Sequence, residues 1–332
     1  MPGSRPRAAV GPAPGEHHPA TGYVLAAIAA ASWATGGLAA KWLFSPVNSQ
    51  TSAWPFPPLG LSVDPVLLSA ARAMVAFAML LVYLLLRRRA ALRISLRDLP
   101  FLGIFGVVGL ALVHFTYFKT ISMTGVATAI LLEYLAPIIV FVFSVSFLKE
   151  RLTWTLPGAV LLSVSGCALM VGAFGEGGVT VSAEGLAWGL SSAVFFAGYT
   201  IMGKYAATRY SSWTVLTYGL GFAALFWVIY LKGPGDVFVL LSDPKGLAAV
   251  SFIAVVSTVI PFGAFLKALQ YIEATKASVT STLEPVIAGI AAWWILGEVL
   301  TPLQVLGGVL VLGAISLAQA PVGRRMALPP AG

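Results

Sequence analysis

The sequence predicts an all-α membrane protein with ten transmembrane helices, arranged as two inverted repeats of five helices each. Composition gives the first indication. Hydrophobic residues make up 58% of the chain and charged residues only 10%, whereas a soluble domain carries about 25% charged residues. The mean hydropathy is +0.91. A long internal repeat and an uneven distribution of Lys and Arg among the loops give the second and third indications.

The repeat relates residues 119–153 to residues 267–301. The two copies, KTISMTGVATAILLEYLAPIIVFVFSVSFLKERLT and KALQYIEATKASVTSTLEPVIAGIAAWWILGEVLT, align without a gap at an offset of 148 residues. Four matched pairs stand out: Lys119 with Lys267, Pro137 with Pro285, Glu150 with Glu298, and Thr153 with Thr301. A repeat of this length indicates that one structural unit occurs twice.

A membrane-spanning helix needs about 20 predominantly apolar residues. Ten segments qualify: 22–44, 65–86, 100–120, 126–148, 154–174, 184–205, 212–231, 246–268, 275–296 and 301–320. They form a first repeat over 22–174 and a second over 184–320. Residues 1–21, rich in Pro, Gly and Ala, predict a disordered tail, and 321–332 a second tail. We prefer a first helix to a cleavable signal peptide, because the apolar run is long and the second repeat needs an equivalent for its own first helix.

The basic residues predict the orientation. With the N-terminus inside, the inner segments hold 14 of the 20 Lys and Arg residues, and the outer loops hold only Lys232 and Lys245. Positive residues gather on the cytoplasmic side of a membrane protein. The sequence therefore predicts an inner-membrane protein with both termini in the cytoplasm. The net charge of +8 is explained in this way and does not indicate nucleic-acid binding.

Five helices is an odd number, so the second repeat must enter the membrane from the opposite side. This inverted arrangement recurs in transporters. The first helices also match, since GGLAAKW around Lys41 is similar to TIMGKY around Lys204. That match needs an offset of 163 residues, and the long outer loop 45–64 accounts for the difference. Trp54 and Phe56 in this loop are expected at the membrane interface, with a lid over an outer opening as the alternative.

Two prolines are expected to break helices. Pro137 and Pro285 lie well inside their segments, and each deprives the carbonyl four residues earlier of its partner. Those carbonyls belong to Glu133 and Ser281, which are equivalent in the repeat. In lipid, a free carbonyl is tolerated only where protein or a water-filled cavity satisfies it. Both broken helices are therefore expected to line a central cavity, and a kink satisfied by a neighbouring helix is the alternative.

Charged residues inside the predicted spans indicate a binding site. Glu133 lies on the same helix face as Pro137, and a charge at the membrane centre costs about 2.5–3.5 kcal/mol on insertion scales. Glu284 directly precedes Pro285. Either acid could bind a proton or a substrate amine; a buried ion pair or a neutral acid is the structural alternative. Arg72 could bind a carboxylate, and Glu133 is its best candidate partner.

Other signals are structural. Glu150 and Glu298 close their helices and are expected to form loop hydrogen bonds or to pair with Lys149 or Arg151. Thr301 followed by Pro302 predicts a helix start. Small residues three apart allow close helix packing in lipid; here they are Gly103, Gly106 and Gly109.

The sequence carries no enzyme signature. It has no HExxH, no GxSxG, no Walker loop and no Cys/His metal spacing. The single cysteine, Cys167, excludes an intrachain disulfide and a cysteine-based metal site. No cofactor is expected. Without a nucleotide site, transport against a gradient would depend on an ion such as the proton or on another solute.

These motifs resemble those of EamA-type transporters of the drug/metabolite transporter superfamily. The resemblance rests on LLEYLAPIIVFVFSVSFLKERLT and TLEPVIAGIAAWWILGEVLT and covers about residues 22–320. It implies ten helices and a pocket formed mainly by helices 1, 3, 4, 6, 8 and 9. By resemblance, the candidate pocket residues are Trp33, His114, Tyr117, Glu133, Tyr199 and Glu284. Lys119, Glu133 and the loop 45–64 depart from many members of the family.

The sequence therefore predicts a secondary transporter that exports small metabolites, with amino acids or related zwitterions as the first candidates. Alternating access of a midplane cavity to the two sides is the expected mechanism. Efflux of cationic drugs and transport of nucleotide sugars or lipid-linked sugars are the alternatives within transport. A passive channel or a membrane enzyme is the alternative from another class.

Overall fold

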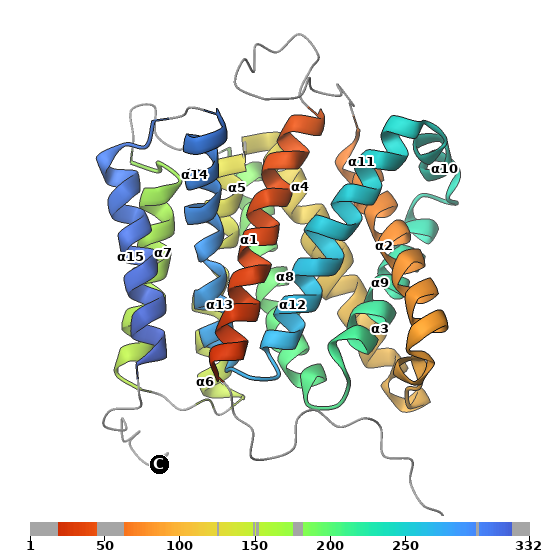
Figure 1. Ribbon diagram of the computed structural model, residues 1–332, viewed down its shortest axis with the longest axis horizontal. Coiled ribbons are helices and arrows are strands. Elements are labelled where there is room, and N and C mark those ends of the chain that lie inside the picture. The colour runs from red at the N-terminus through yellow and green to blue at the C-terminus, as the bar shows by residue number, and fades with distance from the viewer. Residues whose placement is uncertain are drawn as a thin grey trace, which may run out of the picture.

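The computed structural model describes residues 19–44, 63–124, 126–148, 150, 153–174, 182–296 and 299–320, and every regular element among them is a helix (Figure 1). Several expected features lie outside this description: residues 1–18 and 321–332, most of the loop 45–64, Lys149, Arg151, Glu298 and the side chain of Lys41.

The first half of the chain begins with α1 (Pro19–Phe44) and α2 (Pro65–Arg87). Two 3-10 turns, η1 (Arg89–Leu92) and η2 (Leu96–Asp98), lead into one long helical stretch made of α3 (Leu99–Gly106), η3 (Val107–Ala111) and α4 (Leu112–Thr124). The half ends with α5 (Val126–Glu133), α6 (Ala136–Ser146) and α7 (Thr155–Met170).

The second half begins with α8 (Ala183–Ala207) and α9 (Ser212–Tyr230). The short α10 (Gly235–Ser242) is absent from the ten predicted segments and precedes the long stretch of α11 (Pro244–Ala254), η4 (Val255–Val259) and α12 (Ile260–Ala268). The half ends with α13 (Ala274–Ser281), α14 (Leu283–Leu296) and α15 (Pro302–Gln319). Each of the ten expected segments thus coincides with a helix or with helices that follow one another directly.

Seven helical stretches in the described part of the chain are long and apolar enough to cross a membrane. They are Pro65–Arg87, Leu96–Thr124, Val126–Ser146, Ala183–Ala207, Ser212–Tyr230, Pro244–Ala268 and Pro302–Gln319. The apolar α7 is shorter than the others. Spans of this number and length make the chain a multi-pass membrane protein.

Local sequence explains where several helices begin. Asp64 caps α2 by accepting hydrogen bonds from the backbone nitrogens of Val66 (2.8 Å) and Leu67 (3.3 Å). Thr301 forms a capping box with Gln304 at the start of α15, and Pro302 occupies the first turn, where its missing N–H costs nothing. The helix start predicted at Thr301 is confirmed.

Both predicted helix breaks are present. The helix that contains Pro137 is interrupted between the end of α5 at Glu133 and the start of α6 at Ala136. The helix that contains Pro285 is interrupted between the end of α13 at Ser281 and the start of α14 at Leu283. Because a proline cannot donate a backbone hydrogen bond, the regular ladder ends one turn before it.

The two long stretches Leu96–Thr124 and Pro244–Ala268 each contain one π-helical turn. The first is η3 (Val107–Ala111) and the second is η4 (Val255–Val259). Their positions differ by 148 residues (255 − 107), which is the offset of the sequence repeat. A π turn is rare and is often found at functional sites. The two copies therefore share a backbone irregularity as well as a sequence pattern.

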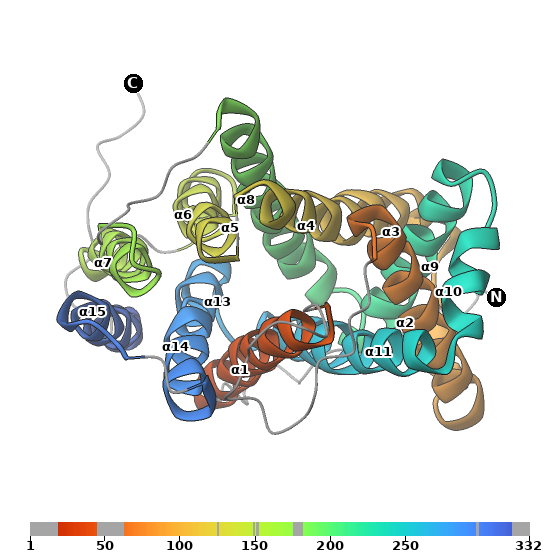
Figure 2. The same ribbon diagram turned by 90° about the horizontal axis from the view of Figure 1, so that it is seen from above.

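Helix packing pairs the two halves in a reciprocal way. The helix α7 packs on α15, and α2 packs on α9 (Figure 2). The helix α1 contacts α12 and α14 of the second half, and its counterpart α8 contacts α4 and α6 of the first half. The pair of α7 and α15 stands at one side of the bundle (Figures 1 and 2). These contacts of one half therefore have equivalents in the other.

Glycine allows the closest helix approaches. A Cβ atom at Gly106 would collide with the carbonyl oxygen of Gly219 on α9, and one at Gly166 of α7 would lie 2.8 Å from the carbonyl oxygen of Gly307 on α15. The predicted close packing is thus confirmed at Gly106. At Gly103 the nearest atoms are side-chain atoms at ordinary contact distance.

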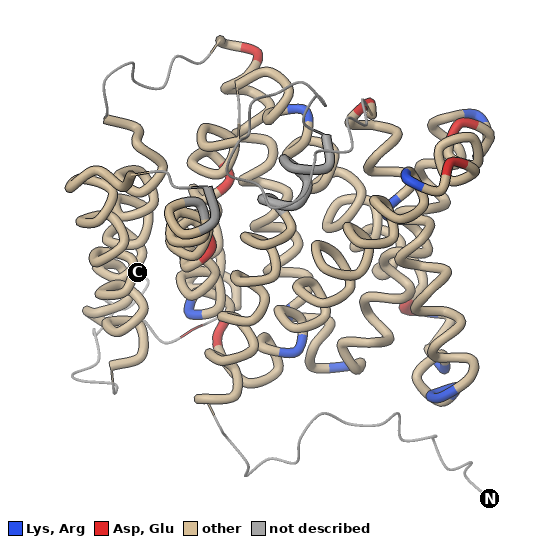
Figure 3. Tube along the Cα trace, turned by 45° about the horizontal axis from the view of Figure 1, so that its top comes forward, with Lys and Arg blue, Asp and Glu red and all other residues tan. Residues whose placement is uncertain are grey.

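Charged residues gather at the ends of the helices (Figure 3). At the end where α8 meets α9, Arg209 pairs with Asp98 at 3.2 Å and the hydroxyl of Tyr210 donates to the same carboxylate at 2.6 Å. Burial raises the pKa of Tyr210, and the hydrogen bond to Asp98 raises it further. These contacts bind the connection between α2 and α3 to the connection between α8 and α9.

Candidate functional site

A cavity of about 290 Å³ lies between the helices and is enclosed mainly by α1, α2, α4, η4 and the two broken helices. At one end of the bundle its lining includes Val63, Pro65 and Val126, where α2 and α5 begin. Further along, its lining includes Glu133 and Glu284 at the helix breaks. The cavity thus connects one end of the bundle to the level at which both helices are interrupted.

Six of the seven predicted binding residues line this cavity: Trp33, Arg72, His114, Tyr117, Glu133 and Glu284. Tyr199 does not. Its side chain is fully buried, and its hydroxyl donates to the carbonyl oxygen of Phe262 at 2.9 Å. The lining residues come from segments up to about 250 positions apart in the sequence (284 − 33), and the fold brings them to one surface.

Arg72 is 4% exposed and is held by η4 of the other half. Its Nε donates to Thr258 Oγ1 at 3.0 Å, and its Nη2 donates to Thr258 Oγ1 and to the carbonyl oxygen of Ser257, both at 2.8 Å. The guanidinium also lies 5.3 Å from the ring centre of Phe118. No contact of Arg72 with Glu133, its expected partner, is found among the described residues, and the guanidinium donates to Ser257 and Thr258.

The backbone of η4 explains why Arg72 donates to it. Ser257 precedes Pro261 by four residues, so its carbonyl lacks the N–H partner that an α-helix would give it, as do the carbonyls four residues before Pro137 and Pro285. An unsatisfied carbonyl in the membrane interior is costly, and Arg72 supplies the missing donor. No hydrogen bond of Arg72 Nη1 is found in the described part of the chain, and the side chain lines the cavity.

Glu133 interacts with the first helix of the second half. The hydroxyl of Ser192, on α8, donates to Glu133 Oε2. Ser192 is fully buried, whereas Glu133 retains access to the cavity. A carboxylate that accepts from a hydroxyl on one side can still accept from a ligand on the other.

Glu284 interacts with the opposite helix break. The hydroxyl of Tyr134, which lies between α5 and α6, is 2.7 Å from Glu284 Oε2 and 2.8 Å from the carbonyl oxygen of Ser281. Ser281 is the residue whose carbonyl Pro285 deprives of its partner. A side chain of the first half therefore satisfies the break in the second half.

Aromatic rings form the apolar wall of the cavity. Trp33 lies edge-on to Phe262 at 5.2 Å and to Phe196 at 5.7 Å between ring centres. His114 packs edge-on against Phe262 at 4.8 Å, and its Nε2 has no hydrogen-bond partner in the described part of the chain. Such a wall offers a ligand a large contact area.

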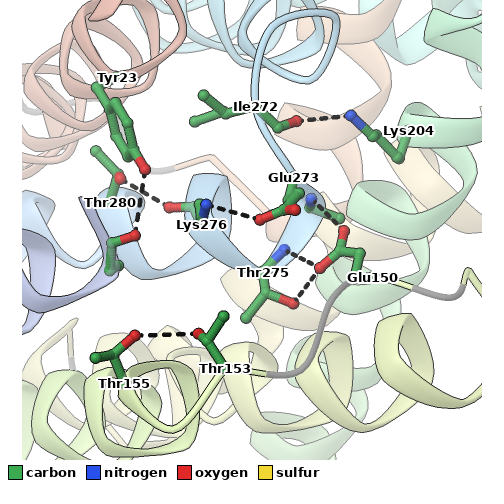
Figure 4. A network of polar contacts seen from close by, with 12 residues as sticks. Tyr23, Glu150, Thr153, Thr155, Lys204, Ile272, Glu273, Thr275, Lys276 and Thr280 are labelled. Carbon is green, nitrogen blue, oxygen red and sulfur yellow. Dashed lines mark hydrogen bonds and ion pairs between the residues drawn. The ribbon is translucent and has the colours of Figure 1, made fainter. Parts of the chain in front are cut away.

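A polar network links the start of α13 with Glu150 and with α8 (Figure 4). Glu150 accepts hydrogen bonds from the backbone nitrogen of Ala274 (2.6 Å) and from the hydroxyl of Thr275 (2.7 Å), which caps α13. Lys204 Nζ donates to the carbonyl oxygens of Leu269 (2.8 Å) and Ile272 (2.7 Å) at the end of α12. The structural role expected for Glu150 is confirmed. Burial raises its pKa, and its hydrogen bonds oppose that rise.

Sequence reasoning missed three parts of this arrangement: the contact of the Tyr134 hydroxyl with Glu284 and Ser281, the contact of Ser192 with Glu133, and the pair Ser257 and Pro261. Only the last carried a local signal, since a proline four residues after Ser257 marks a carbonyl in need of a donor. The described residues contain no cluster of three His, Cys, Asp or Glu side chains that could hold a metal ion.

Comparison with known proteins identifies the family. The sequence model of the EamA-like transporter family matches residues 20–172 and again residues 183–319. The pseudopaline exporter CntI of Pseudomonas aeruginosa is 29% identical over 239 residues, which are 72% of this chain and 81% of the relative. The probable terminal-alkyne amino-acid exporter of Streptantibioticus cattleyicolor is 27% identical over 69% of this chain and 76% of the relative.

Two further similarities agree. The uncharacterized inner membrane transporter YicL of Salmonella typhimurium is 28% identical over 69% of this chain and 76% of the relative. A solved crystal structure of a protein aligns with 90% of this chain and 96% of its own chain, with a TM-score of 0.70 and 21% identity, which shows a shared fold. With the family match extending over both halves, this chain belongs to the EamA-like transporter family.

Proposed function

We propose that the protein is a secondary active transporter that exports small metabolites across the inner membrane, with amino acids or related zwitterions as the first candidates. The observation that carries the proposal is the cavity that runs from one end of the bundle to the helix breaks, where a buried Arg72 and two acids line its wall. Both termini would lie in the cytoplasm, as the distribution of basic residues predicts.

The proposal includes ten crossings in two inverted repeats, 22–174 and 184–320. Three observations support it: the family match occurs twice, the π turns share the 148-residue offset, and the contacts of α1 with α12 and α14 match those of α8 with α4 and α6. In this arrangement α1, α7 and the stretch of α13 and α14 also cross the membrane. Inverted repeats with broken helices at a central site are a common plan of secondary transporters.

The chemistry of the wall suits a ligand with opposite charges. Arg72 has a nitrogen without a partner in the described part of the chain and would bind a carboxylate. Glu133 or Glu284 would bind an amine, and the aromatic wall with Trp33 would contact the remainder. Two relatives, one a pseudopaline exporter and the other a probable terminal-alkyne amino-acid exporter, support an exporter of amino-acid-like compounds.

Alternating access follows from the asymmetry between the two ends. The cavity opens at the end where α2 begins, which the predicted orientation places outside, and the network of Glu150 and Lys204 closes the other end. Export requires the reverse arrangement as well, in which the inner end opens and the outer end closes.

Counterflow in proteoliposomes tests the proposal. Vesicles are loaded with an unlabelled amino acid, and uptake of the labelled compound is followed with and without a pH gradient. Saturable counterflow that Glu133→Gln and Glu284→Gln reduce is the expected result. Flux without saturation or counterflow would indicate a channel, and a response only to sugars, nucleotides or cationic drugs would replace the substrate class. Flux unchanged in both variants would overturn the assignment of the acids.

A further inference from the structure

If Glu284 is charged, two acceptors at the contact between the helix breaks compete for one proton, that of the Tyr134 hydroxyl. The Tyr134 hydroxyl lies within hydrogen-bond distance of two oxygens, Glu284 Oε2 at 2.7 Å and the Ser281 carbonyl at 2.8 Å. A phenol has a single proton to donate. If Glu284 is ionised, both neighbours are acceptors, and only one of them can receive that proton.

The Ser281 carbonyl needs the Tyr134 proton, because it has no helical donor. Its helical partner would be the backbone nitrogen of residue 285, which is a proline and carries no hydrogen. Ser281 is fully buried, and leaving a buried carbonyl unpaired costs about 1–3 kcal/mol. A proton on Glu284 satisfies every group: the carboxyl donates to the Tyr134 oxygen, and Tyr134 donates to Ser281.

We propose that Glu284 is the proton-binding site of the carrier in this conformation, and that Tyr134 couples its protonation to the helix break between α13 and α14. This assignment deepens the transport function proposed above and rests on it. When Glu284 releases its proton, the Tyr134 hydroxyl donates to the Glu284 carboxylate instead, and the Ser281 carbonyl loses its donor. The break is then free to rearrange.

The surroundings permit this exchange. Glu284 lines the cavity, so water at the open end gives protons a route to it. The titratable side chains that face it are Tyr134, Tyr117, Glu133 and Cys167. None of these four is a cation at neutral pH, and Arg72 is held by Ser257 and Thr258. No direct ion pair of Glu284 is found in the described part of the chain.

Glu133 differs in its partner. It accepts a hydrogen bond from Ser192, whose hydroxyl has no second acceptor in the described part of the chain. An ionised carboxylate fits that geometry without leaving another group unpaired. In this proposal Glu284 binds the proton, and Glu133 stays available to a substrate amine.

Infrared difference spectroscopy of the full-length protein in liposomes tests this assignment without any substrate, so its result is independent of the counterflow assay. The spectrum at alkaline pH is subtracted from the spectrum at mildly acidic pH. We expect the wild-type protein to lose the carbonyl band of a protonated carboxylic acid as the pH rises. Glu284→Gln, whose amide can still donate to Tyr134, should lack that band, and Glu133→Gln should retain it.

Tyr134→Phe provides a second test that does not need Glu284→Gln to fold. Removing the hydroxyl deprives the protonated acid of its acceptor, so its band should change frequency. The matched control is Tyr218→Phe, because the Tyr218 hydroxyl also donates to a backbone carbonyl, that of Leu92 at 2.8 Å, but far from any acid. Absence of the band from the wild-type protein, its loss in Glu133→Gln, or an unchanged frequency in Tyr134→Phe would overturn the proposal.

Discussion

At the scale of single residues, two buried side chains do similar work. Arg72 and Tyr134 both lie in the first half, and each donates to a carbonyl in the second half that a proline has left unpaired. The donor is separated from its acceptor by 185 residues in one case and by 147 in the other. The polarity of these side chains thus serves the fold first, and their remaining hydrogen-bonding capacity is what a ligand can use.

Replacement of Arg72 by lysine should lower the stability of the protein although the charge is kept. A single ammonium group cannot reproduce the fork that reaches both Ser257 and Thr258, and one unpaired buried group costs about 1–3 kcal/mol. The measurement is the midpoint of thermal unfolding of the purified protein. Arg89→Lys is the control, since its bond to the Leu85 carbonyl is exposed; equal midpoints for the two variants would contradict the argument.

Two adjacent serines separate the role of Glu133 from general effects on α8. Ser192→Ala removes the donor to Glu133, and a hydrogen bond to a charged group is worth about 1.5–3 kcal/mol. We expect lower stability and slower counterflow. Ser191→Ala removes only a bond to the Ala187 carbonyl at the surface and should leave both unchanged. Equal counterflow in the two variants would argue against a role for Glu133.

At the scale of the elements, local chemistry predicts the breaks and the helix starts, because a proline or a capping threonine acts within one turn of its own position. It does not predict the partners. Nothing near Arg72 in the sequence indicates η4, and nothing near Tyr134 indicates Ser281. The π turns also have no sequence signature; their repetition at the offset of 148 residues shows that they belong to the repeated unit.

Pro285→Ala restores the backbone nitrogen that the Ser281 carbonyl lacks, so α13 and α14 should join into one helix. We expect the thermal midpoint to stay the same or rise while counterflow falls, because the break can no longer rearrange. Pro302→Ala is the control, since Pro302 lies in the first turn of α15 where no hydrogen bond is gained. Full transport by Pro285→Ala would show that the break is not needed.

The pair of α7 and α15 depends on close backbone contact. Gly166→Ala would place a Cβ atom 2.8 Å from the carbonyl oxygen of Gly307, and overpacking of this kind costs about 1–3 kcal/mol. Gly158→Ala, on the same helix, meets only a terminal carbon of Leu317 at 3.4 Å. We expect a lower unfolding midpoint for the first variant and little change for the second; the reverse order would contradict the packing described.

At the scale of the whole molecule, the sequence predicts the membrane class and the helical segments well, because apolar length and repeat spacing are properties of long segments. The cavity is harder to predict, since its wall joins residues from both halves. Tyr199 illustrates the difficulty: its sequence position resembles that of a pocket residue, yet the helix turns its side chain into the core.

The proposed orientation can be measured with single cysteines in a Cys167→Ser background. Thr208→Cys and Lys245→Cys both lie at exposed positions, at the end of α8 and the start of α11 respectively. A membrane-impermeant thiol reagent added to intact cells should label residue 245 at once and residue 208 only after the cells are broken. The opposite pattern would place the termini outside.

The one-sided supply of donors to the proline-freed carbonyls bears on how the chain is made. Arg72 and Tyr134 leave the ribosome well before Ser257 and Ser281, so both donors are already in the bilayer when the carbonyls arrive. The late half, produced by itself, would carry the Ser257 and Ser281 carbonyls into lipid without these donors. Split genes should therefore yield a C-terminal fragment that is degraded unless the N-terminal fragment is present.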